Sequence, residues 1–123
     1  MDIKLYQSWE LQAGEKIAGY DITGGLGDLS IAVNGQSIYT PFPGQTALDR
    51  QRPNCLYLDA PEVPAYRFRF CGIQTPKLGS VQKGEAIATV NTLQFATLQK
   101  QANGTWAMVE PSRKLLEQFL QPI

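Results

Sequence analysis

The feature that most constrains the fold of this chain is a pair of Asn-Gly dipeptides, each set between two stretches typical of β-strands. Asn34-Gly35 separates Asp28–Val33 from Gln36–Thr40. A two-residue hairpin turn of type I′ needs positive φ at both central residues, and Asn-Gly meets that need best. We therefore expect a β-hairpin here, in which Ile31 lies opposite Ile38.

The second dipeptide, Asn103-Gly104, predicts another hairpin, between Phe95–Ala102 and Thr105–Val109. The same residues with Thr105 also form a sequon for N-glycosylation. The turn is the favoured interpretation, and a glycan acceptor is the alternative.

A third hairpin is predicted around Val63, which lies just before Pro64. Pairing residues whose numbers average to 63 sets Leu56 against Phe70 and Leu58 against Phe68 on an apolar face. The opposite face then pairs Asp59 with Arg67, Tyr57 with Arg69, and Cys55 with Cys71. Because both faces are consistent, we expect this register throughout the hairpin.

The chain is expected to close with a short helix. Pro111 suits the first helical position, and Pro122 would end the run. The apolar residues recur at helical spacing, at Leu115, Leu116, Phe119 and Leu120. We expect this helix to cap the open end of a β core, with partner binding as the less favoured role.

Length and composition fit one folded domain. The chain has 123 residues, of which 43% are hydrophobic, enough for a packed core. We expect a single domain, 1–123, with an N-terminal extension or edge segment at 1–16, a β core at 17–110 and the terminal helix at 111–121. The 11 basic and 11 acidic residues give zero net charge, which argues against nucleic acid as a main partner.

The sequence leaves the cellular compartment open. No apolar run of about 18 residues occurs, so we expect no transmembrane segment. The first residues, Met1–Leu5, lack the long apolar stretch of a signal peptide. The protein would belong to the periplasm or cell envelope if a leader had been removed, and to the cytoplasm otherwise.

Cys55 and Cys71 are the two cysteines of the chain. In the predicted hairpin they lie directly opposite, within reach of a disulfide. An oxidising compartment would favour a bridge that closes a loop of about 15 residues and stabilises the fold by roughly 3 kcal/mol. A cytosolic protein would instead keep two reduced thiols. Because the chain has no histidine, an activated cysteine nucleophile is not expected.

Neither the glycine-rich stretch nor the acidic residues predict a binding or catalytic site. Thr23–Asp28 is rich in glycine, but a strand pattern follows it, whereas a phosphate loop opens a helix. A flexible turn is therefore favoured over an anion site. The acidic residues are scattered, and their spacing brings no two carboxylates together for acid–base catalysis.

Several motifs occur in the order found in one known family. Leu78–Ala88 resembles a "G-x-V-x-K-G-x-x-I" turn and strand, and Ile38–Thr46 resembles an "I-x-A-P-x-x-G-x-V" hairpin. Gly19–Ile22 is similar to "G-x-D-I". Leu93–Ala96, followed by the Asn103-Gly104 hairpin and Val109–Pro111, resembles "L-H-F-E", a hairpin and "V-D/N-P" before a last helix. Over roughly residues 19 to 121 this order resembles the LytM-like (lysostaphin-type, M23) zinc peptidases.

The resemblance implies an all-β barrel-sandwich hybrid, a duplicated hybrid motif of antiparallel hairpins with a short C-terminal helix. It also implies that the zinc chemistry is lost. The family binds zinc through a His before "G-x-D", that Asp, and the His of "L-H-F-E"; the corresponding residues here are Ile17, Asp21 and Gln94. A second catalytic His of the family falls in the strand that here runs over Arg67–Gly72. One carboxylate and one amide fall short of a zinc site, so we expect no metal, no cofactor and no hydrolase activity.

The carrier domains that share the barrel-sandwich fold attach their cofactor to a Lys at a hairpin tip. The tips expected here, Phe42–Gln45 and Val90–Thr92, hold no Lys. A carrier function is therefore not expected.

The resemblance thus implies a non-catalytic binding or regulatory module of the bacterial LytM-like kind, whose vestigial groove docks a protein partner or a cell-wall glycan-peptide. The candidate groove residues are Gln94, Asp21, Arg69 and Tyr57. The alternative is a structural subunit of a larger assembly, including one at a membrane, with a sheet edge or the terminal helix as interface. An enzyme of unfamiliar chemistry is the least favoured hypothesis, and the oligomeric state is open.

Overall fold

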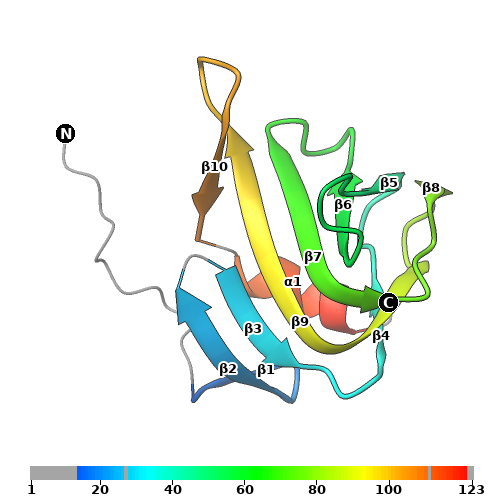
Figure 1. Ribbon diagram of the computed structural model, residues 1–123, viewed down its shortest axis with the longest axis vertical. Coiled ribbons are helices and arrows are strands. Elements are labelled where there is room, and N and C mark those ends of the chain that lie inside the picture. Colours follow the sequence, from blue (N-terminus) through cyan, green and yellow to red (C-terminus); the bar gives the residue numbers. More distant parts are fainter. Residues whose placement is uncertain (1–13, 27, 111, 122–123) are drawn as a thin grey trace.

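The structure is a computed structural model that describes residues 14–26, 28–110 and 112–121. These residues form ten β-strands, all paired antiparallel, and one α-helix (Figure 1). The strands are β1 (Lys16–Ile17), β2 (Tyr20–Leu26), β3 (Asp28–Ala32), β4 (Ser37–Tyr39), β5 (Gly44–Leu48), β6 (Cys55–Asp59), β7 (Tyr66–Gln74), β8 (Gly79–Val81), β9 (Ala86–Lys100) and β10 (Trp106–Val109), and the helix is α1 (Arg113–Leu120). The expectation of an all-β fold with a short C-terminal helix is confirmed. No helix in this described part is long and apolar enough to cross a membrane.

Strand β9 organises the sheet. It is 15 residues long, and on one side it pairs with β7 over most of its length. On its other side it pairs in succession with β4, β3 and β10. The remaining strands extend the sheet outward, as β2 and β1 beyond β3, and as β6, β5 and β8 beyond β7. Figure 1 shows the long curve of β9 through the middle of the molecule.

The hairpin predicted at Asn34-Gly35 is wrong. Strands β3 and β4 do not pair with each other; both pair with β9, so that Ile31 lies opposite Leu93 rather than Ile38. Asn34 and Gly35 do adopt positive φ, of 62° and 84°, and the backbone amides of this segment donate hydrogen bonds to β9. The two residues form a kink between consecutive strands, because β9 is long enough to pair with both.

A second expected hairpin, within Ile38–Thr46, is also absent. Strand β4 pairs with β9, whereas β5 pairs with β6 and β8. Gly44 begins β5 at a point where a Cβ atom would collide with the backbone carbonyl of Asp59. The chain therefore turns from one part of the sheet to another at this segment, and a glycine permits the close approach.

The other two hairpins are confirmed. The register of β6 and β7 is the predicted one at all four pairs: Cys55 with Cys71, Leu56 with Phe70, Tyr57 with Arg69, and Leu58 with Phe68. Strands β9 and β10 form the last hairpin. Its loop is longer than the two-residue turn expected, because Gln101 and Thr105 close it and Gly104 takes a φ of 86°. This is the three-residue loop in which a glycine follows a turn.

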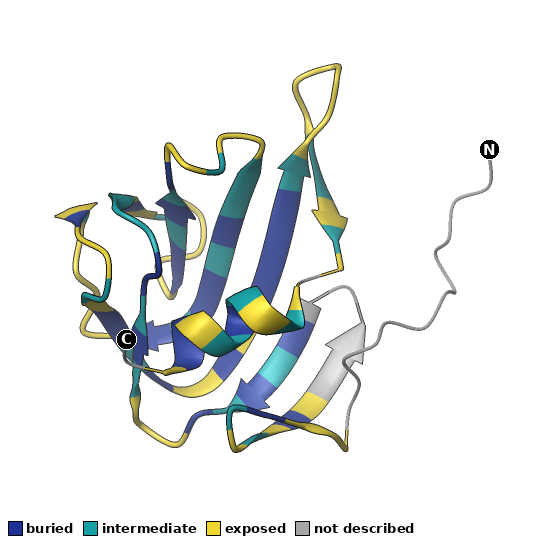
Figure 2. Cartoon of the chain, turned by 180° about the vertical axis from the view of Figure 1, so that it is seen from behind, coloured by how far each residue is buried: buried dark blue, intermediate teal, exposed yellow. Residues whose placement is uncertain are grey.

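The core lies between one face of the sheet and α1. Phe119 of the helix packs against Phe68, Phe70 and Phe95, with ring centroids 5.0–5.6 Å apart. Figure 2 shows α1 crossing this inner face of the sheet. Its buried residues are Leu116, Phe119 and Leu120.

The start of α1 differs slightly from the prediction. The helix begins at Arg113, and Ser112 caps it by accepting a hydrogen bond from the amide of Leu115 at 3.3 Å. Pro111, expected at the first helical position, lies outside the described residues.

The glycine-rich stretch Thr23–Asp28 is not followed by a helix. Most of it belongs to β2, and Asp28 begins β3, which pairs with β2. Residue 27 lies outside the described residues. The strand predicted after the glycines is therefore correct, whereas the flexible turn favoured for Thr23–Asp28 is wrong over Thr23–Leu26, which belongs to β2.

Candidate functional site

The sheet face opposite α1, here called the outer face, carries the candidate site. Side chains alternate between the two faces of a strand, and directly paired residues share a face. Phe68 and Phe70 of β7 point to the helix, so Arg67, Arg69 and Cys71 belong to the outer face. Their partners on β6 and β9 lie on the same face.

All four residues predicted for a groove lie on this outer face, but only three are neighbours. Gln94 is exposed and pairs with Cys71 of β7. Arg69 lies two residues before Cys71, and Tyr57 is paired with Arg69. Gln94, Arg69 and Tyr57 therefore occupy adjacent positions on three neighbouring strands.

Asp21 lies apart from them. It sits on β2, paired with Ala32 of β3, so that β3 separates its strand from β9. Its carboxylate is bound to Lys16 Nζ at 2.8 Å. Asp21 lies on the outer face, but the structure does not bring it to Gln94.

The positions that correspond to zinc ligands in the resembling family do not converge. Ile17 pairs with Tyr20 and is 1% exposed, within the core. Its side chain thus faces the interior, whereas those of Asp21 and Gln94 are exposed to solvent. Among the described residues, no group of three or more Cys, Asp or Glu side chains is placed to hold a metal ion.

Cys55 and Cys71 form a disulfide between β6 and β7. The backbone N–H and C=O of Cys55 bond to Arg52 and Asp49, away from β7. The cysteines are thus a pair without mutual backbone hydrogen bonds, the arrangement that brings side chains closest. Both are buried, and Cys71 lies beside Gln94 on the outer face.

A group of polar and aromatic side chains on the outer face is centred on Arg67. Its Nε and Nη2 atoms donate to Asp59 Oδ1 and Oδ2, both at 2.9 Å. The guanidinium lies 5.0 Å from the ring centroid of Tyr57 and 5.1 Å from that of Trp106, within cation–π range. The hydrogen bonds to Asp59 raise the pKa of Arg67 above its ordinary value. We call Tyr57, Asp59, Arg67 and Trp106 the Arg67 cluster.

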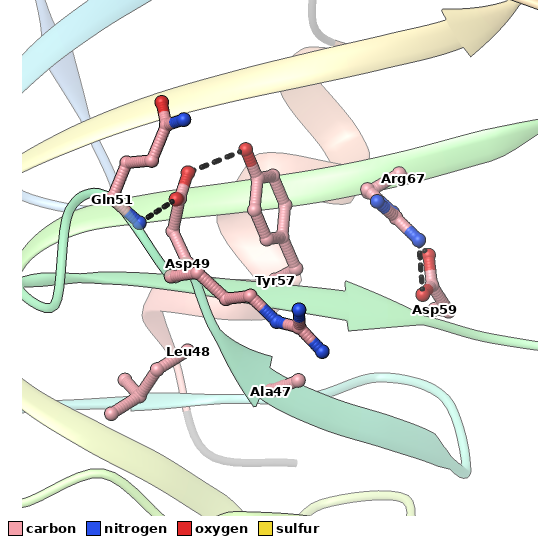
Figure 3. A pocket seen from close by; sticks show the side chains of 8 residues that line it. Ala47, Leu48, Asp49, Gln51, Tyr57, Asp59 and Arg67 are labelled. Atoms are coloured by element: carbon pink, nitrogen blue, oxygen red, sulfur yellow. Dashed lines mark hydrogen bonds and ion pairs between the residues drawn. The ribbon is translucent and has the colours of Figure 1, made fainter.

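Asp49 supports this cluster from the loop after β5. Its Oδ2 accepts a hydrogen bond from the hydroxyl of Tyr57 at 3.0 Å, and its Oδ1 accepts from the amides of Gln51 and Arg52 at 2.8 and 3.3 Å. Figure 3 shows the hydrogen bond between Asp49 and Tyr57 and the two bonds between Arg67 and Asp59. The bond from the Gln51 amide, followed by that from Tyr57, holds the pKa of Asp49 below its ordinary value.

Two open hollows flank the Arg67 cluster. One, of about 400 Å³, is lined by the loop after β5 together with Tyr57, Asp59 and Arg67. The other, of about 370 Å³, lies toward Trp106 and Lys100 and shares Asp59 and Arg67. The ion pair therefore forms a ridge between two depressions.

Sequence reasoning missed Trp106, Asp49 and the site role of Arg67. The predicted β6–β7 register did pair Asp59 with Arg67, and this pair is formed. Trp106 on β10 comes within reach of Arg67 on β7 because both strands pair with β9, one on each side. No local pattern reports that β7 and β9 are neighbours, so this contact had no signal in the sequence.

No protein-family model and no curated protein matches the chain.

Proposed function

We propose that this protein is a non-catalytic binding module that docks a protein or peptide partner on its outer face, through the Arg67 cluster. One observation carries the proposal: Trp106, Tyr57 and Arg67 are stacked together at the surface. Trp, Tyr and Arg are the residue types most enriched among the residues that dominate binding energy at protein interfaces.

The order of the cluster supports this role. The bidentate ion pair fixes the guanidinium of Arg67, and Asp49 holds the Tyr57 hydroxyl. Side chains that are already ordered lose less conformational entropy on binding. The hollows on either side could receive side chains of the partner.

The surroundings of the cluster also suit an interface. Asp49, Arg50 and Lys100 line the hollows beside the aromatic rings, so charged residues of both signs surround the rings of Tyr57 and Trp106. Gln94 and Arg69 adjoin the cluster on the same face. They are proposed as secondary contacts, and Asp21 is left out because it lies on β2.

The LytM-like resemblance supports a loss of catalysis in favour of binding. Gln94 would correspond to the position at which that family has a zinc-binding His. A cell-wall glycan-peptide would then be the alternative to a protein partner. This part of the proposal rests on the order of the sequence motifs alone.

The test is a quantitative capture experiment with the full chain as bait. Wild type, Trp106→Ala and Met108→Ala are compared, since Trp106 and Met108 lie two residues apart on β10. We expect the same partner to bind wild type and Met108→Ala, and Trp106→Ala to weaken binding of the purified partner by about 30-fold, as for a central interface residue.

Cosedimentation with purified cell-wall sacculi runs in parallel. Binding to sacculi that depends on Trp106 would favour the glycan-peptide alternative. If neither a partner nor sacculi are retained by wild type above an unrelated β protein, the proposed function is wrong.

A second role, as a subunit of a larger assembly, is favoured by β10. Within the described sheet this strand pairs only with β9, and Met108 on it is 39% exposed. An open strand edge can pair with another chain. Size-exclusion chromatography of native extract that shows the protein only at its monomer size would exclude this role.

A further inference from the structure

The two Asn-Gly dipeptides of the chain differ in how their backbone is held. Both asparagines are exposed to solvent, so exposure does not distinguish them. Asn34-Gly35 lies in the kink between β3 and β4, which both pair with β9, whereas Asn103-Gly104 lies at the tip of the β9–β10 hairpin. The contrast matters chemically, because asparagine is a thermally labile residue and is most labile before glycine, whose nitrogen is the least hindered.

The backbone around Asn34 is tied to β9. The amide of Asn34 donates to the carbonyl of Asn91 at 2.9 Å, and that of the following Gly35 donates to the carbonyl of Val90 at 2.7 Å. The preceding residue, Val33, is fully buried. Freeing the Gly35 amide therefore requires this part of the sheet to separate from β9, an opening that costs a large share of the global stability.

The tip of the β9–β10 hairpin is held by short-range bonds. The amide of Gly104 donates to the carbonyl of Gln101 at 2.9 Å, and the amide of Gln101 donates to the carbonyl of Thr105 at 2.7 Å. All residues from 101 to 105 are exposed. The tip can therefore open while the sheet stays intact, and local openings of this kind cost little free energy.

The side-chain carbonyl of Asn103 also carries two hydrogen-bond donors. Its Oδ1 accepts from the amide and from the hydroxyl of Thr105, at 3.1 and 2.7 Å. Such donors draw electron density from the carbonyl carbon and stabilise the negative charge that forms on the oxygen when a nucleophile adds. At Asn34 the printed side-chain bond is of another kind, since Nδ2 donates to the carbonyl of Ala32 at 3.4 Å. Asn103 thus combines an easily opened backbone with an activated carbonyl.

We propose that Asn103 is a site of spontaneous deamidation through a succinimide, and that the fold protects Asn34 from the same reaction. The backbone nitrogen of Gly104 loses its proton to solvent base and attacks Cγ of Asn103. The new N–Cγ bond closes the succinimide ring as the Cγ–Nδ2 bond breaks, and Nδ2 takes up a proton and leaves as ammonia. Water then opens the ring at either carbonyl, which gives aspartate or isoaspartate at position 103.

Either product changes the hairpin tip. Residues 101–105 have no charged side chain, so the new carboxylate gives the tip a negative charge close to Trp106 of the Arg67 cluster. Isoaspartate also leads the main chain through Cγ, which lengthens the turn by one carbon atom. The modification is independent of the proposed function, because it alters the tip whether or not a partner binds.

The test compares the two sites within the same molecule. Wild type of full length is incubated at pH 8 and 37 °C, once folded and once unfolded in urea, and the peptides that contain Asn34 or Asn103 are quantified by mass spectrometry. In the folded protein, Asn103 is expected to deamidate at least about 10-fold faster than Asn34. In urea, where neither backbone is held, the two rates should become similar. Isoaspartate should be detected in the Asn103 peptide by the enzyme that methylates it.

Asn103→Gln is the control variant, because its longer side chain does not readily close the corresponding ring. Isoelectric focusing of aged wild type should show a new acidic band, and aged Asn103→Gln should lack it. Equal rates at Asn34 and Asn103 in the folded protein would overturn the proposal. So would an Asn103 product without isoaspartate, or an acidic band that persists in Asn103→Gln.

Discussion

The side chain of Asp49 orders both its own loop and Tyr57 of the Arg67 cluster. Its carboxylate accepts hydrogen bonds from two backbone amides of its own loop and from the hydroxyl of Tyr57. Asp and Asn commonly bond to amides two and three residues ahead and so fix turns. Here the same carboxylate also orients one wall of the Arg67 cluster, so the loop and the cluster depend on one ionised group.

This arrangement predicts a pH effect on stability. The folded-state pKa of Asp49 is lowered from its ordinary value of 3.8, first by the Gln51 amide and then by Tyr57. The ionised carboxylate therefore stabilises the folded state above pH 3.8, and this contribution is lost as the pH falls below 3.8 through the folded-state pKa. We expect Asp49→Asn to lower the urea midpoint at pH 7 and to differ less from wild type at pH 2.5.

Tyr57→Phe is the matched variant for this experiment. It removes one of the three donors to Asp49 and should give a smaller loss at pH 7 in the same direction. A difference between Asp49→Asn and wild type that stays constant from pH 7 to pH 2.5 would show that ionisation of Asp49 has no part in stability.

At the scale of elements, the success of prediction depended on how many constraints acted on each pairing. The β6–β7 hairpin was predicted pair by pair because charges and cysteines matched on one face while large apolar residues matched on the other. At Asn34-Gly35 the turn residues were the main evidence for a hairpin. Their positive φ values were correct, but β3 and β4 both pair with β9, and the paired residues are 47 to 66 positions apart in the chain. Local turn chemistry fixes dihedral angles, not strand partners.

Helix α1 offers a direct test of the core. Phe119 is fully buried and contacts three phenylalanine rings of the sheet. Phe119→Ala is expected to lower the free energy of unfolding by about 3–5 kcal/mol, the usual cost of truncating a buried aromatic residue. Gln118→Ala, at an exposed position of the same helix, should change it by less than about 0.5 kcal/mol. Chemical denaturation measures both, and equal effects would refute the packing of α1 on the sheet.

At the scale of the whole molecule, the candidate site could be foreseen only in part. The hairpin register put Tyr57 and Arg69 side by side, whereas Gln94 was named only through the family resemblance, and its place beside them follows from the pairing of β9 with β7. The ridge between the two hollows needs β6, β7, β9 and β10 in this order. That order depends on the pairing of β7 with β9, in which Arg67 lies opposite Leu98, and no turn motif joins those two strands.

The disulfide joins β6 to β7 within the sheet, and its removal is expected to destabilise the entire domain. Cys55 and Cys71 are 16 residues apart. Loss of a bridge that closes a loop of this size is expected to lower the free energy of unfolding by about 3 kcal/mol. The variant with both cysteines changed to serine is compared with wild type by thermal unfolding, and alkylation with mass spectrometry verifies the bridge in wild type. Equal melting temperatures would contradict this expectation.

The central place of β9 has a consequence for how the chain can reach this structure. Phe95 on β9 pairs with Leu29 near the beginning of the chain and with Phe70 in its middle. While the ribosome makes the protein, β3 and β4 emerge long before the strand that will hold them. Strands that follow each other along the chain, such as β2 and β3 or β6 and β7, can pair early. The two halves of the sheet can join only after β9 has been synthesised. Such distant pairing makes folding slow, on the order of milliseconds to seconds. It also leaves the edges of β3 and β7 unpaired until β9 has emerged.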